Sequence, residues 1–78
     1  MDIEEHHGRK IVCRHIFKAD EIKIGSRWQG SGGSIVEVTS VDGLGWVEYK
    51  WNDSLGEVKV HEKESFAFQC RYCLIVDE

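Results

Sequence analysis

The stretch GSIVEVTSVDGLGWVEYKW, residues 33–51, decides the fold class. It predicts two β-strands, because Val, Ile, Thr, Trp and Tyr dominate both flanks and these residues favour a pleated, half-buried surface. The pair Asp42-Gly43 between the flanks predicts a tight two-residue hairpin turn, since both central residues of such a turn need positive φ. A lone hairpin is only marginally stable in water, so the rest of the chain must supply further strands.

Alternation along the second strand of this hairpin separates buried from exposed positions. Val47 and Tyr49 share one face and are expected to be buried, with Trp51 further along that face at the edge of the core. Trp46 falls on the opposite face and is the tryptophan that we expect to be exposed. Trp28, in an earlier strand, is expected to be buried, because a core this small has room for only part of the aromatic content.

The first strand of the hairpin departs from strict alternation. Val38 and Val41 both have the character of buried residues but lie three positions apart, which predicts a β-bulge near Thr39-Ser40. The run GSGGS before this strand, residues 30–34, predicts a turn between two strands. A phosphate-binding loop is disfavoured there, because no Gly-Lys-Ser/Thr follows and the next element is a strand.

Four further segments supply the other strands. We expect them at residues 10–17 (KIVCRHIF), where the imperfect alternation leaves a helix as the alternative, and at residues 22–28, 57–61 and 72–76. Within the third of these, Val58 and Val60 are expected to point inward and Lys59 outward. Residues 18–21 and 52–56 predict turns, and residues 62–69 predict a helical turn or an irregular crossover. Residues 1–9 are expected to be a flexible N-terminus, which leaves residues 10–78 as a single domain.

Five or six short strands with turns about every eight to ten residues suit a small closed or partly open barrel. The order of core and turn positions resembles that of short SH3-like (Tudor-like) barrels, which many small phage and prophage proteins of unassigned function share. The resemblance spans residues 22–76 and rests on the following positions: Ile24-Gly25-Ser26-Arg27-Trp28, a glycine turn, Ile35-Val36-Glu37-Val38, Val41-Asp42-Gly43, Val47-Glu48-Tyr49, Phe66 and Leu74-Ile75-Val76.

The resemblance implies an all-β, five- or six-stranded SH3-like barrel with an N-terminal extension strand and a short helical turn before the last strand. It also implies an origin in a phage or prophage. No functional residue comes with it, because the pattern consists of core and turn positions, and a shared fold does not define a site.

Composition places the chain among soluble globular domains. It has 78 residues, of which 41% are hydrophobic and 31% charged, values that fit a single folded domain rather than a disordered chain. No apolar run approaches the roughly 20 residues that a membrane helix needs. The first ten residues, MDIEEHHGRK, contain no apolar segment of a signal peptide, so we expect a cytoplasmic protein without membrane contact.

Charge is distributed unevenly along the chain. The net charge is −4, from 10 basic and 14 acidic residues. Removing the five acids at the two ends leaves 9 acids (14 − 5) against 10 bases, so the body is nearly neutral; the five are Asp2, Glu4, Glu5, Asp77 and Glu78. A nearly neutral body argues against a strong phosphate-binding surface and against an acidic mimic of DNA.

The cysteines and histidines form the sharpest chemical motif. Cys13 and His15 form a C-x-H pair, and Cys70 and Cys73 form a C-x-x-C pair, so together they offer four ligands for a tetrahedral zinc. Against zinc, Cys73 opens the apolar run CLIV, and free cysteine is among the most buried residue types. The odd number of cysteines and the lack of a secretion signal argue against a disulfide framework. A zinc-stabilised mini-domain therefore stays a minor alternative.

For function, the sequence predicts a non-enzymatic protein-interaction module. Trp46 is the candidate anchor, since exposed aromatic rings are common binding hot spots, and free strand edges would suit β-augmentation. With the resemblance, this implies a phage accessory protein that binds or inhibits a host protein. No catalytic signature appears, and a barrel this small leaves little room for a substrate cleft.

The alternative is a small nucleic-acid-binding barrel in which Trp46 and Trp51 stack on bases. Lys50, Lys59 and Arg71, with Arg27 as a further basic residue, would then contact the phosphates. This interpretation requires the basic residues to converge on one side of the molecule. A homodimer formed through residues 10–17 is a further possible association.

Overall fold

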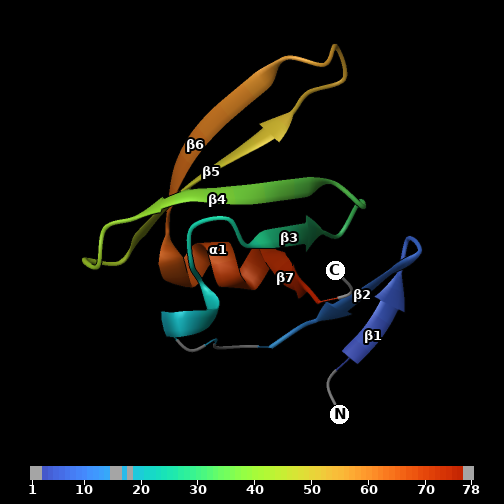
Figure 1. Ribbon diagram of the computed structural model, residues 1–78, viewed down its shortest axis with the longest axis horizontal. Coiled ribbons are helices and arrows are strands. Elements are labelled where there is room, and N and C mark those ends of the chain that lie inside the picture. Colours follow the sequence, from blue (N-terminus) through green and yellow to red (C-terminus); the bar gives the residue numbers. More distant parts are fainter. Residues whose placement is uncertain (1–2, 15–16, 18, 77–78) are drawn as a thin grey trace.

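Seven strands and one short α-helix make up the fold in the computed structural model, which describes residues 3–14, 17 and 19–76 (Figure 1). In chain order the elements are β1 (Ile3–His6), β2 (Arg9–Val12), a 3₁₀ turn (Ala19–Glu21), β3 (Arg27–Gly30), β4 (Ile35–Val41), β5 (Trp46–Asn52), β6 (Val58–Glu64), α1 (Ser65–Arg71) and β7 (Tyr72–Ile75).

All seven strands belong to one antiparallel sheet in the order β1-β2-β7-β3-β4-β5-β6. The mostly-β class expected from the sequence is therefore confirmed, with more strands than the five or six expected. In the described part of the chain, β1 and β6 form the two edges and no ladder joins them. Closure into an SH3-like barrel thus stays a prediction.

The core is built around Trp28, whose side chain is fully buried, as the sequence predicts. Its ring meets the ring of Phe17 edge-on at 4.7 Å between centroids and that of Phe68 at 5.2 Å. The indole N–H of Trp28 donates a hydrogen bond to Ser26 Oγ at 3.0 Å, so the buried polar atom is satisfied. Val47 and Tyr49 are also buried, in agreement with the alternation of β5.

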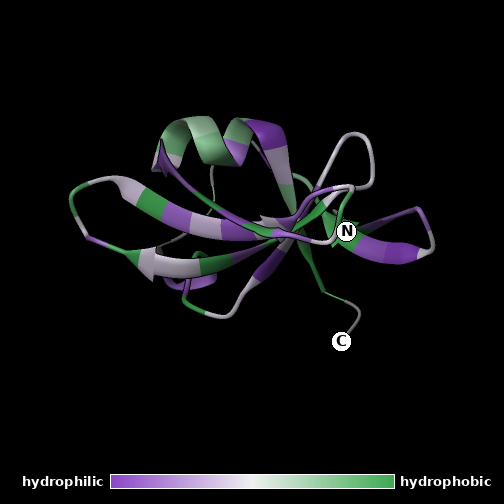
Figure 2. Cartoon of the chain, turned by 90° about the horizontal axis from the view of Figure 1, so that it is seen from above, coloured by the Kyte–Doolittle hydropathy of each residue, from purple (hydrophilic) through white to green (hydrophobic). Residues whose placement is uncertain are grey.

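The helix α1 covers one side of the sheet and connects the edge strand β6 to β7 (Figure 2). It occupies part of the segment for which the sequence predicts a helical turn. Phe68 packs from it into the core, while Phe66 and Cys70 are exposed. Among the described residues, no helix has the length and apolar character needed to cross a membrane.

The turn of the central hairpin differs from the expected two-residue loop. The loop between β4 and β5 has four residues, 42–45, with positive φ at Gly43 and Gly45. Asp42 closes it, because its Oδ1 accepts hydrogen bonds from the N–H groups of Leu44 (2.8 Å) and Trp46 (3.0 Å).

A two-residue turn with both φ values positive occurs elsewhere, between β1 and β2. Its central residues are His7 (φ 54°) and Gly8 (φ 76°), and His6 pairs directly with Arg9 across it. This hairpin places strand β1 in the segment that the sequence predicts to be flexible. The strand expected at residues 10–17 ends at Val12, and residues 15 and 16 lie outside the described chain.

The expected bulge in β4 is confirmed by a register shift between Val38 and Ser40. Two expectations of burial are wrong. Val41 is 40% exposed, because it lies at the end of the strand beside the hairpin loop. Val58 and Val60 are 61% and 55% exposed, because the pairing of β6 with β5 places them on the face opposite Tyr49.

Candidate functional site

Strands β5 and β6 form a two-stranded ribbon that extends beyond the rest of the sheet (Figure 1). Residues directly opposite each other in an antiparallel pair point to the same face. We call the face that carries Val47 and Tyr49 the inner face, since these residues are buried, and the other face the outer face. Every residue of β6 except the half-buried Lys63 is exposed, so both faces of the ribbon meet solvent along β6.

The inner face of the ribbon combines rings with basic groups. Cross-strand pairing places Lys63 opposite Val47, His61 opposite Tyr49 and Lys59 opposite Trp51. The half-buried Trp51 contacts the His61 ring edge-on at 4.6 Å. At the far end of the ribbon, Lys59 pairs with Glu57 at 3.2 Å and with Asp53 at 3.8 Å. These ion pairs are exposed and contribute little to stability.

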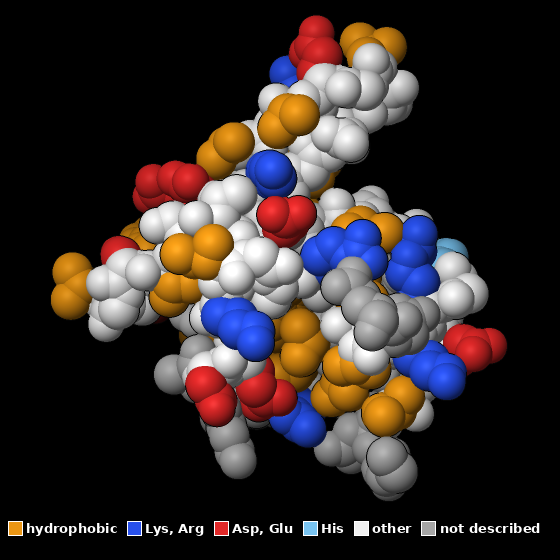
Figure 3. Space-filling view, viewed as in Figure 1, with side chains coloured by type: hydrophobic (Ala, Val, Ile, Leu, Met, Phe, Trp, Pro, Cys, Tyr) orange, Lys and Arg blue, Asp and Glu red, His pale blue; other side chains and the backbone are white. Residues whose placement is uncertain are grey.

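The outer face of the ribbon combines apolar side chains with carboxylates. Trp46 is 49% exposed on this face, as the sequence predicts, and Val58 and Val60 lie on the same face further along the ribbon. Glu48 lies directly opposite Glu62, and Trp46 lies opposite Glu64. In the view of Figure 3, hydrophobic side chains on the projecting ribbon are interspersed with charged ones, and no charge of a single sign dominates that face.

The five binding residues predicted from the sequence do not form one surface. Trp46 and Lys50 lie on the outer face of the ribbon, whereas Trp51 and Lys59 lie on its inner face. Arg71 ends α1 and is close enough to Tyr49 to act on it electrostatically. Of the predicted lysines, only Lys59 lies on the inner face, opposite Trp51, so the convergence of basic groups that a nucleic-acid surface requires stays a prediction.

The free edge of β6 is the most distinctive feature of the ribbon. Its seven residues pair with β5 on one side, and on the other side the sheet ends. A free edge presents unpaired N–H and C=O groups that can pair with another strand. By contrast, β2 pairs with β1 on one side and β7 on the other, so a dimer through residues 10–17 could not form by adding a strand to β2.

Tyr49 links the ribbon to the core through Tyr72. Its ring lies 5.7 Å from the Tyr72 ring and 5.1 Å from Phe68. Burial, together with the Coulombic influence of Tyr72 and a hydrogen bond to it, raises the pKa of Tyr49 from 10.0 to about 12. The ring contacts of Tyr49 fix the base of the ribbon to α1 and β7. The β6 residues at its tip are exposed to solvent.

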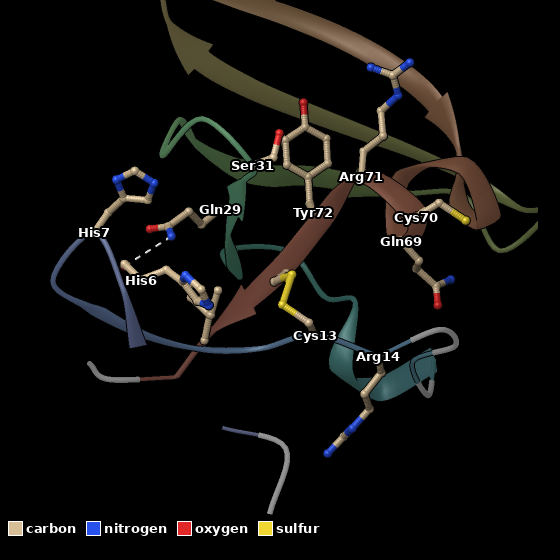
Figure 4. Close-up of a pocket in the computed structure, with 13 residues that line it drawn as sticks. His6, His7, Cys13, Arg14, Gln29, Ser31, Gln69, Cys70, Arg71 and Tyr72 are labelled. Carbon is tan, nitrogen blue, oxygen red and sulfur yellow. Dashed lines mark hydrogen bonds between the residues drawn. A yellow bond between two sulfur atoms is a disulfide. The ribbon is translucent and has the colours of Figure 1, made fainter. Parts of the chain in front are cut away.

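A pocket of about 630 Å³ lies on another part of the molecule (Figure 4). Its lining comes from three stretches far apart in the sequence: the β1–β2 hairpin and the residues that follow it (within 6–14), the end of β3 with the start of the glycine loop (29–31), and the junction of α1 with β7 (69–73). In Figure 4, His7, Ser31 and Tyr72 lie in the upper part of the view, and the disulfide formed by Cys13 lies below Tyr72.

The cysteines differ from the sequence prediction. Cys13 and Cys73 form a disulfide with an S–S distance of 2.13 Å, which corrects the expectation that no disulfide forms. It also takes two of the four thiol and imidazole groups proposed for zinc. Cys70 is an exposed free thiol, and His15 lies outside the described residues. In the described ranges, no three His, Cys, Asp or Glu side chains are grouped to hold a metal ion.

Pairing of these two cysteines could not be read from the sequence, because they are 60 positions apart and connectivity depends on the sheet order. Antiparallel pairing of β2 with β7 brings the two cysteines close together, since Val12 lies opposite Leu74.

The outward orientation of the β6 valines had a signal in the sequence, namely the alternation of β6. It shows that Val58 and Val60 share a face, but not which face of the sheet that is.

Comparison with known proteins returned no match: no family model, no curated protein and no solved structure is similar to this chain.

Proposed function

We propose that the protein is a non-enzymatic interaction module that binds an extended segment of a partner protein at the free edge of β6. The observation that carries this proposal is a seven-residue edge strand with two outward valines, Val58 and Val60, both more than half exposed. Strand addition at such an edge derives affinity from main-chain hydrogen bonds and specificity from alternate side chains.

Trp46 extends this surface at the base of the ribbon. It lies on the same outer face as the two valines and leaves about half of its surface exposed. Large aromatic rings of this kind are enriched among the residues that dominate interface energetics. The valines would provide the apolar contacts along the edge, and Trp46 would provide an anchor where the ribbon joins the sheet.

The side chains of β6 favour a different protein over a second copy of this chain. In the symmetric antiparallel register that overlaps the whole of β6, Lys59 would face Lys63, and Val60 would face Glu62. Like charges directly opposite each other destabilise strand pairing. The favoured partner is a strand with acidic side chains facing Lys59 and Lys63 and apolar side chains facing the valines. In the phage or prophage setting that the resemblance implies, that partner is a host protein.

The experiment compares three tagged baits in nuclease-treated lysate of the source cells, with bound proteins identified by mass spectrometry. The baits are the wild type, Val60→Lys, and Ile3→Lys as a matched control. Ile3 is 44% exposed on β1, the other edge of the sheet. We expect a protein that the wild type and Ile3→Lys retain and that Val60→Lys loses. A partner retained equally by all three baits, or no protein enriched by the wild type, would contradict the proposal.

The same pull-down from lysate without nuclease treatment tests the alternative function, nucleic-acid binding. If the wild type recovers only proteins that disappear after nuclease treatment, the inner face becomes the binding surface and nucleic acid the ligand. That function is favoured by the presence of Trp51, Lys59 and His61 on one face. Its signature is an affinity for single-stranded oligonucleotides that falls steeply with salt concentration.

A further inference from the structure

The pocket beside the disulfide is independent of the ribbon edge, since none of the residues that line it belongs to β5 or β6. Its volume of about 630 Å³ lies within the range of roughly 300–1,000 Å³ that small-molecule sites occupy. It is therefore large enough for a small organic ligand.

The walls of the pocket are held in place before any ligand binds. The buried side chain of Gln29 accepts a hydrogen bond from Arg9 at 3.1 Å and donates one to the His6 carbonyl at 3.3 Å. Gly30 allows the Tyr72 ring to approach closely, because a Cβ at position 30 would lie 3.3 Å from that ring. Pre-formed walls lower the entropic cost of binding a ligand.

Among the described residues, the arginines that line the pocket give it a positive charge. In the described part of the chain, no Asp or Glu lines the pocket. Arg14 and Arg71 both line it, together with His6 and His7. Glu21 partly offsets Arg14 through an ion pair of 2.6 Å. Among the described residues, no carboxylate pairs with Arg71, so its charge is available to a ligand.

The remaining surface of the pocket is apolar and partly aromatic. Ile11, the Cys13–Cys73 disulfide and the ring of Tyr72 contribute to it. Tyr72 is fixed against Phe68, with 4.8 Å between ring centroids. A fixed ring beside an apolar floor suits a planar aromatic group. The guanidinium of Arg71, which Figure 4 shows on the side of Tyr72 away from the disulfide, carries five N–H donors and suits an anion.

We propose that this pocket binds a planar aromatic molecule that carries a single anionic group, with the anion on Arg71 and the aromatic body over the disulfide floor. Two sources share this chemistry: a nucleoside monophosphate and an aromatic carboxylate. The proposal does not depend on strand addition at β6, and either can fail without the other.

The test is an NMR titration of the isotope-labelled, oxidised protein with four compounds. Adenosine monophosphate and indole-3-acetate are the anions, and adenosine and indole-3-acetamide are their neutral counterparts. We expect saturable shifts at the amides of Ser31, Arg71 and Tyr72 with at least one anion, and affinity about tenfold weaker for its neutral counterpart. The anion that binds more tightly shows whether the ligand is a nucleoside monophosphate or an aromatic carboxylate.

Three variants make the result specific to the pocket. Arg71→Gln should weaken the anion about tenfold or more and leave the neutral compound unchanged. Arg27→Gln, on β3 outside the pocket, is the matched control and should leave both unchanged. Ser31→Trp, at an exposed loop position, should block both compounds without unfolding the domain. No saturable shift, equal affinity for charged and neutral compounds, or shifts confined to the ribbon would overturn the proposal.

Discussion

Trp28 in the body of the sheet is fully buried, whereas Val60 in the β5–β6 ribbon is 55% exposed, although both lie in strands of the same antiparallel sheet. The sequence predicts an inward orientation for both side chains. What differs is the layer above them, because Phe68 of α1 covers Trp28, and the ribbon extends beyond the helix (Figure 1). The difference shows that alternation assigns residues to faces, whereas the packing of other elements decides which face is buried.

The largest expected effect on stability distinguishes Trp28, in the body of the sheet, from Trp46, in the β5–β6 ribbon. Trp28→Ala should destabilise the protein by about 3–5 kcal/mol, since it removes a buried ring from the centre of the core. Trp46→Ala should cost less, about 1–2 kcal/mol, because about half of that side chain stays exposed in the folded protein. Urea unfolding followed by circular dichroism measures both. Similar losses in the two variants would mean that the ribbon contributes to the core.

The next largest expected effect on stability comes from the disulfide, which links the segment after β2 to strand β7. Cys13 and Cys73 are 60 positions apart. In the chain-entropy model, closing a loop of this length lowers the entropy of the unfolded chain and so stabilises the folded state by about 4 kcal/mol. Cys13→Ser, or reduction of the wild type, should lower the stability by up to about this amount.

Cys70→Ser is the matched control for the disulfide, because Cys70 is a free and exposed thiol. It should leave the melting temperature unchanged in both oxidised and reduced protein. If a reductant has no effect on the melting temperature of the wild type, the disulfide does not contribute to stability as expected.

A smaller effect arises at the junction of body and ribbon, where Tyr49 is buried and its pKa is raised to about 12. In the unfolded chain this hydroxyl ionises near its ordinary pKa of 10.0. Below about pH 10 both states keep the proton, so stability is unaffected by this group. As the pH rises from about 10 to about 12, the unfolded state loses the proton first and stability falls.

Tyr49→Phe removes this ionisation and should flatten the alkaline loss of stability. The measurement is the free energy of urea unfolding at about pH 9 and about pH 11 for wild type and variant. The difference in stability between the two pH values should be smaller in the variant. The same difference in both proteins would mean that burial and the neighbouring Tyr72 do not raise the pKa of Tyr49.

The hairpin loops show where local sequence rules succeed and where they fall short. The pair Asp42-Gly43 correctly marks a turn, but the loop is four residues long because the Asp42 carboxylate bonds two backbone N–H groups. Asp53 closes the β5–β6 loop in the same way, through the N–H groups of Leu55 and Glu57 at 2.9 Å each. The sequence repeats Asp-x-Leu-Gly at both loops, a local signal from which the longer loop could have been predicted.

The candidate site was only partly predictable. Exposure of Trp46 followed from alternation, because Val47 and Tyr49 beside it are apolar and buried. The free edge of β6 could not be predicted, since a strand becomes an edge only through the order in which strands pair. The pocket could not be predicted either, because its lining comes from three segments that only the folded chain brings together.

The sequence by itself determined the mostly-β class, the central hairpin, the bulge in β4 and the burial of Trp28, Val47 and Tyr49. The class, the hairpin and the bulge depend on residues close together in the chain, where alternation and turn chemistry act. For Trp28, Val47 and Tyr49 the sequence predicts the inward face, and distant elements cover it, as Phe68 of α1 covers Trp28. Only the tertiary structure decided the strand order, the Cys13–Cys73 bond and the outward orientation of Val58 and Val60. Each of these depends on contacts between distant segments, and a period of two residues identifies a face of a strand without saying what will cover it.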